Sequence, residues 1–207
     1  HGPLQSEKFY PVFAGAPDDA RHTEWDARCG FRNAAEAIAT RREGDAHALA
    51  LLGARPVWLE FADSQYGQTP SLAPLVQALR ARLAPMRPAC VLFPLGLFHS
   101  DHRLVHEACI AALASLPDVQ AMAYEDALYR GMPGLLQARL AELHGAGVQA
   151  TPARVAATGH ANVKAAAVQA YASQLRAFGP GGYDDTARPE RLWLLERMAD
   201  DGSPHGR

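Results

Sequence analysis

The sequence has no large excess of positive or negative charge, and it has no long apolar run. Its 207 residues carry twenty basic and twenty-two acidic side chains, so the cationic surface needed to bind a phosphate backbone is not expected. No stretch approaches the roughly 18 apolar residues of a membrane-spanning helix, and the first residues lack a signal-peptide pattern. We therefore expect a cytoplasmic protein that binds neither nucleic acid nor a membrane.

Cysteine and glycine patterns exclude three further classes. The three cysteines, Cys29, Cys90 and Cys109, lie in separate apolar contexts, which fits neither a disulfide framework nor a CxxC zinc site. We expect them to be reduced thiols in the core. The GxGxxG turn of dinucleotide-binding proteins does not occur, which argues against a nucleotide-binding Rossmann protein. The length fits a single domain over residues 1–207.

Apolar runs alternate with segments of helical periodicity along the first part of the chain. Strands are predicted at residues 9–14, 56–61, 89–93 and 119–123, and helices at 33–52, 71–83 and 101–116. This alternation predicts an α/β fold, a Rossmann-like open, mostly parallel sheet flanked by helices. The run at 89–93 is wholly apolar, as in a strand buried on both faces. Later in the chain, helices are predicted at 133–144, 161–178 and 189–198, and an extended segment at 148–156.

A cluster of polar residues follows the strand at 89–93. His99, Asp101 and His102 lie there at the start of a helix, and ligands of open α/β sheets bind at the carboxyl ends of strands. Zinc binds imidazole and carboxylate ligands and lowers the pKa of its bound water to about 7, so the cluster indicates a metal site. The alternative is that these residues only cap the helix. A second arrangement, His102 with His106 and Glu107, lacks a third ligand of known position. We expect His106 to be solvated, or to contact a metal ligand without binding the metal itself.

Several stretches, in this order, resemble the LmbE-like or PIG-L de-N-acetylases, which are zinc-dependent hydrolases of N-acetylated amino sugars. The element FPLGLFHSDH at 93–102 resembles the His-x-Asp-His signature of that family, and RREGDAHALALLG at 41–53 resembles its arginine-led helix. The other similar stretches are residues 12–15, PVWLEFADSQY at 56–66, and KAAAVQAYASQ at 164–174.

The resemblance implies roles for five residues. His102 would be a zinc ligand, and His99 would polarise the amide oxygen or donate a proton, with Asp101 orienting it. A carboxylate beside an imidazole stabilises its protonated form, so this assignment agrees with general acid chemistry near neutral pH. Arg41 and Asp63 would contact substrate hydroxyls; the alternatives are a surface cation and a strand-end cap.

The sequence departs from the family pattern in three places. The His-Pro-Asp-Asp signature, which ends the first strand of the family and supplies two zinc ligands and the general base, is not found; the similar letters at 16–19, APDD, are read as a turn. Gly44 stands where the family has a glutamate that would pair with Arg41. The segment before Phe9 is too short for a strand and a crossover helix. Either the chain lacks its first strand, which we favour, or half of the metal site is lost; His1 and His22 are conceivable substitute ligands.

We expect a zinc-dependent hydrolase that removes an N-acetyl or N-acyl group from an amino sugar or a glycosyl conjugate. The alternative is a metal-free, catalytically silent sugar-binding module of the same fold. The residues do not indicate which acyl group or sugar is recognised, nor the oligomeric state.

Overall fold

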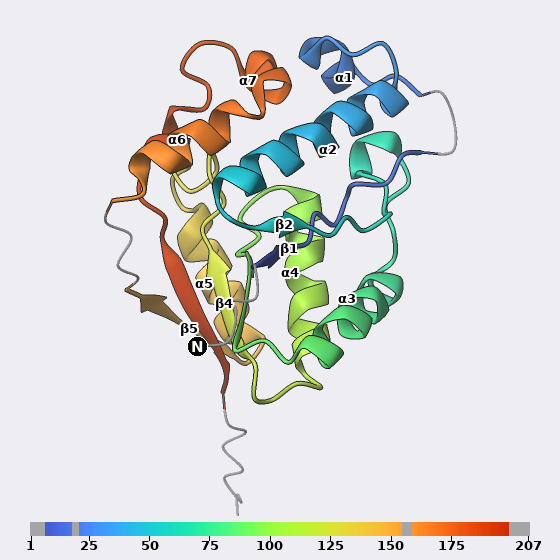
Figure 1. The fold of residues 1–207 in the computed structure, drawn as a ribbon. Coiled ribbons are helices and arrows are strands. Elements are labelled where there is room, and N and C mark those ends of the chain that lie inside the picture. The colour runs from blue at the N-terminus through green and yellow to red at the C-terminus, as the bar shows by residue number, and fades with distance from the viewer. Residues whose placement is uncertain (1–6, 18–20, 155–158, 199–207) are drawn as a thin grey trace, which may run out of the picture.

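The computed structural model describes residues 7–17, 21–154 and 159–198 of an α/β structure (Figure 1). The helices are α1 (Glu24–Cys29), α2 (Ala34–Leu51), α3 (Leu72–Met86), α4 (Ser100–Leu113), α5 (Leu135–Gly145), α6 (Ala161–Gln169) and α7 (Ala172–Phe178), with 3-10 turns η1 (Ser64–Tyr66) and η2 (Asp184–Ala187). The strands are β1 (Lys8–Phe9), β2 (Arg55–Pro56), β3 (Cys90–Pro94), β4 (Gln120–Tyr124), β5 (Val148–Ala153) and β6 (Leu192–Arg197). The turn expected at 16–19 lies partly outside the described residues.

The larger sheet is mixed, which corrects the expected mostly parallel sheet. Its strand order is β3-β4-β6-β5, in which β3 and β4 are parallel and β6 is antiparallel to both of its neighbours. The helix predicted at 189–198 is therefore wrong. Consecutive apolar residues from Leu192 to Leu195 suit a strand that pairs on both sides, because its two faces are both partly covered.

The first two predicted strands form a smaller, irregular parallel ladder. β1 pairs with β2, and beyond them the amide of Leu59 donates to the Pro11 carbonyl at 2.9 Å. The amide of Ala14 donates in turn to the carbonyl of Leu59 at 3.3 Å. Residues 8–14 thus run beside residues 55–61, where the two strands are predicted, although regular strand geometry covers only two residues of each.

The strand predicted to be buried on both faces lies at an edge of the larger sheet. Among the described strands, β3 pairs only with β4, and the side chain of Leu92 is 52% exposed. Cys90, at the start of β3, is also exposed, so the expectation that all three thiols lie in the core is wrong for this one. Cys29 and Cys109 are buried, and all three are free thiols.

Helices pack against the strands and against one another. α3 packs against α4, and α2 packs against α6 across the top of the view in Figure 1. The helix expected at 161–178 is divided into α6 and α7 by a break at Ala170 and Tyr171. In the described parts of the chain, no helix has the length and hydropathy needed to cross a membrane.

Candidate functional site

The loop between β3 and α4 carries the predicted cluster, and a glycine fixes its path. Gly96 has φ +78°, and a Cβ added there would lie 3.1 Å from the Cα of Arg103. Only glycine combines this left-handed backbone with such a close approach. The loop is therefore held tightly against the first turn of α4, at the carboxyl end of β3, where the sequence places it.

His102 is oriented by a buried carboxylate from the neighbouring strand end. Its Nδ1 lies 2.7 Å from Oδ1 of Asp126, which is fully buried, while Oδ2 of Asp126 accepts the backbone N–H of Leu97 at 2.7 Å. A carboxylate only accepts hydrogen bonds, so the Nδ1 of His102 carries the proton. In the neutral ring, the lone pair is then on Nε2, on the side away from Asp126. This is the arrangement by which a carboxylate fixes the tautomer of a metal-binding histidine.

His99 has two alternative partners for its Nδ1 atom. It occupies the N-cap position of α4, where Nδ1 accepts the backbone N–H of Asp101 at 3.3 Å. The carboxylate of Asp101 is 3.8 Å from the same nitrogen, and its Oδ1 is buried without a hydrogen-bond partner. Nδ1 of His99 therefore caps the helix, with the Asp101 carboxylate beside it. The capping interpretation and a proton-transfer role are compatible at this position.

Asp63 reaches the same edge from the segment after residue 61. Its Oδ1 accepts the N–H of Gln65 at 2.9 Å, so it caps η1, and the neighbouring Ser64 N–H approaches Oδ2 of Asp101 at 3.4 Å. Burial raises the pKa of Asp63, and the nearby charge of Asp101 raises it further, while Arg41 and His99 lower it. The carboxylates of Asp63 and Asp101 therefore lie close enough for their charges to interact.

Arg41 is not a surface cation. Its guanidinium donates to Oδ1 of Asp26 at 2.7 Å, and Asp26 is fully buried and also accepts the hydroxyl of Tyr66 at 3.1 Å. Asp26, on α1, is thus the buried carboxylate partner of Arg41. Gly44 makes a close approach of its own: a Cβ there would lie 3.2 Å from the Ala170 carbonyl oxygen, so a larger residue would crowd the break between α6 and α7.

The second predicted arrangement is not formed, because the side chains of His106 and Glu107 do not share a site with His102. His106 is 2% exposed, and its Nδ1 donates to the Pro94 carbonyl at 2.9 Å, whereas Glu107 faces solvent. Burial is the main reason that the pKa of His106 falls to about 4. The expectation that His106 is solvated is wrong, because it is a neutral histidine of the core.

The described residues do not by themselves make a zinc site. Zinc sites use three or four protein ligands, and the described parts of the chain contain no group of three or more His, Cys, Asp or Glu placed to hold a metal ion. His102 offers one oriented imidazole. His22, a conceivable substitute, lies 2.8 Å from the carbonyl of Phe31 instead, and His1 is outside the described residues.

Two buried carboxylates that contact predicted site residues are not predicted from the sequence: Asp126 bonds to His102, and Asp26 bonds to Arg41. Asp126 follows the predicted strand at 119–123, so the rule that polar residues at strand ends form sites could have found it. Asp26 gives no such signal, because it lies on a short helix and meets Arg41 only through tertiary packing.

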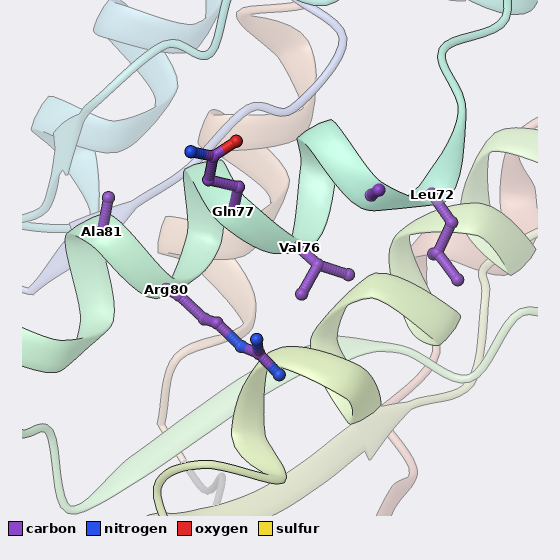
Figure 2. Close-up of a pocket in the computed structure, with 6 residues that line it drawn as sticks. Leu72, Val76, Gln77, Arg80 and Ala81 are labelled. Carbon is purple, nitrogen blue, oxygen red and sulfur yellow. The ribbon is translucent and has the colours of Figure 1, made fainter.

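A hollow of about 720 Å³ beside α3 offers no comparable chemistry (Figure 2). Its only charged side chain, Arg80, already donates to the carbonyl of Ala111 at 2.8 Å. The lining residues are Leu72, Ala73, Val76, Gln77, Arg80 and Ala81. The edge formed by the residues around His102 is therefore the stronger candidate site.

No protein-family model matches the chain, and no curated protein does so with significance. Solved structures do match. A triple mutant of the deacetylase Orf2 of teicoplanin biosynthesis aligns with TM-score 0.70 and 19% identity, covering 95% of this chain and 87% of that one. The A40926 pseudoaglycone deacetylase Dbv21 aligns with TM-score 0.65 and 21% identity, covering 94% and 86%. The chain has the fold of these deacetylases.

Two further structures of the teicoplanin deacetylase show what that protein binds. Its zinc-inhibited form aligns with TM-score 0.69 and 18% identity, covering 95% of this chain and 89% of the other. Its complex with teicoplanin aligns over 95% of this chain and 88% of the other, with TM-score 0.66 and 18% identity. The resemblance to LmbE-like deacetylases expected from the sequence is confirmed for the fold.

Proposed function

We propose that this protein is an N-deacylase that hydrolyses the amide of an N-acylated amino sugar in a glycosyl conjugate. The observation that carries the proposal is the convergence of His99, Asp101, His102 and the buried Asp126 at the carboxyl edge of β3 and β4. The deacetylase fold over about 95% of the chain supports it. Both supports are needed, because a fold alone does not imply an activity.

His99 is placed to supply the proton that the reaction requires. Hydrolysis forms a C–O bond from water and breaks the C–N bond, and the leaving amine must take up a proton. The side chain of His99 is 41% exposed, so its Nε2 can reach a bound substrate, while Asp101 beside Nδ1 stabilises the protonated ring. When Nε2 has given up its proton, Nδ1 keeps its own proton beside the Asp101 carboxylate.

Arg41 and Asp63 form the part of the site proposed to bind substrate hydroxyls. Arg41 is fixed by Asp26, and Asp63 is fixed by the backbone of η1, so both groups are held before a ligand arrives. Preorganised polar groups of this kind give orientation and specificity. The relatives solved with teicoplanin make a glycopeptide the first substrate to examine.

Zinc is retained as a proposed cofactor, with His102 Nε2 as one ligand. When bound, zinc supplies a nucleophilic water at neutral pH. Because the described residues provide too few ligands, a zinc-bound state needs further ligands from outside them. The same observation favours the second candidate function, a metal-free sugar-binding module.

Release of amine from N-acylglucosamine conjugates and from teicoplanin, measured by mass spectrometry, tests the proposal. Zinc should be titrated from below one equivalent, because one relative was solved in a zinc-inhibited form. We expect turnover by the wild type, loss of turnover in His102→Ala, and a fall of about 10²–10⁴-fold in His99→Ala.

An exposed ion pair provides the control. Arg32, 84% exposed and paired with Glu36, lies on the surface, so Arg32→Gln should keep full activity. Saturable binding of the same ligands without amine release at any zinc concentration would contradict the deacylase proposal and establish the binding module.

A further inference from the structure

The turn that carries Asp126 has a strained backbone. Residues 126–130 form a turn in which the N–H of Arg130 donates to the Asp126 carbonyl at 3.0 Å. Within it, Leu128 has φ +71°, a left-handed conformation that is unfavourable for a non-glycine residue. Such a conformation persists only where surrounding contacts impose it.

The contacts that impose it come from η2, more than fifty residues later. Oδ2 of Asp185 accepts the backbone N–H of Leu128 at 3.1 Å and the Nε–H of Arg130 at 2.7 Å. The guanidinium of Arg130 also donates to the backbone carbonyls of Asp185 and Pro189, at 2.6 and 3.0 Å. Its side chain is only 4% exposed, and that of Asp185 is 16% exposed.

We propose that the Arg130–Asp185 pair is a positioning clamp that presents Asp126 to His102 and so sets the tautomer of the candidate catalytic histidine. Asp126 is joined to the clamp through the turn, and to His102 and Leu97 through its two carboxylate oxygens. Releasing the turn would withdraw the acceptor from Nδ1 of His102. The proton would then move to Nε2, the nitrogen that the site presents to substrate or metal.

The functional meaning of the clamp rests on the proposed deacylase site, but its first test needs no turnover. Long-range ¹H–¹⁵N NMR of the imidazoles at alkaline pH, with His102 assigned by substitution, reports which nitrogen carries the proton. In the wild type we expect the Nδ1–H form to dominate. In Arg130→Met and in Asp185→Ala, which removes the acceptor of both bonds, the Nε2–H form should become the major species.

Two further variants sharpen this test. In Asp126→Asn, the amide oxygen is needed by the Leu97 N–H, so the amide N–H₂ faces His102 and should enforce the Nε2–H form. Arg188→Gln is the matched control, because Arg188 is 70% exposed and approaches the same Asp185 from 3.4 Å. Its spectrum should equal that of the wild type.

The outcomes separate the clamp from the deacylase proposal. If Asp185→Ala or Arg130→Met is folded, as its amide dispersion will show, and keeps the wild-type tautomer, the clamp is refuted. If the tautomer changes and turnover falls about 10- to 100-fold, as for other partners that orient histidine ligands, the clamp and its role both hold. A changed tautomer in a protein without turnover supports the clamp and contradicts the proposed deacylase activity.

Discussion

His106 should make the protein lose stability as the solution is acidified. Burial, with the charges of Arg139 and Arg103, lowers the pKa of its ring to about 4, against smaller opposing effects of the Pro94 carbonyl and Asp126. The folded state thus requires a neutral ring, whereas the unfolded chain takes up a proton near pH 6.5. The contribution of the neutral His106 ring to the free energy of unfolding is fully present above pH 6.5. It falls by about 1.4 kcal/mol per pH unit as the pH approaches 4.

Between about pH 7 and pH 5, this one histidine should lower the free energy of unfolding by about 2 kcal/mol. Urea unfolding of the wild type and of His106→Asn at both pH values measures the effect, because the asparagine amide can still donate to the Pro94 carbonyl but does not titrate. His47→Asn, at an exposed position of α2, is the matched control and should retain the wild-type pH dependence. An equal loss of stability in the wild type and in His106→Asn would refute the reasoning.

Two helix glycines should respond differently to alanine. Gly145→Ala meets no atom within 4 Å and should raise the free energy of unfolding by about 0.5–1 kcal/mol, whereas Gly44→Ala, facing the Ala170 carbonyl at 3.2 Å, should lose that gain; equal stabilisation in thermal melts would contradict the close contact. Asp26→Ala leaves Arg41 without its buried partner and should destabilise the fold by about 3–5 kcal/mol. Denaturant titration measures this loss, and a loss below about 1 kcal/mol would show that the pair contributes little.

The sequence predicts those elements whose local pattern agrees with their final environment. The helix at 33–52 is correct because Asn33 caps it and alanine and leucine recur along it. The strands predicted at 89–93 and 119–123 are correct because a short apolar run between polar turns is typical of a β-strand. The carboxyl edge of these two strands then places His99, Asp101 and His102 without further information.

The errors arise where tertiary pairing decides. Residues 192–197 become a strand only because β4 and β5 leave space for it between them, and this antiparallel insertion is what makes the sheet mixed. The exposure of Leu92 reflects a strand order that local patterns do not encode. In the same way, Asp26 and Asp185 act through partners 15 and 55 residues away, so no local motif reveals them.

The central claim is that His102 presents its Nε2 atom as a working group of the site. Anomalous scattering from crystals grown with one equivalent of Zn²⁺ tests it most directly. We expect a peak about 2.0–2.1 Å from Nε2 of His102, with Asp126 still bonded to Nδ1. A zinc peak on other residues, in crystals of a preparation that hydrolyses N-acylated amino sugars, would contradict it.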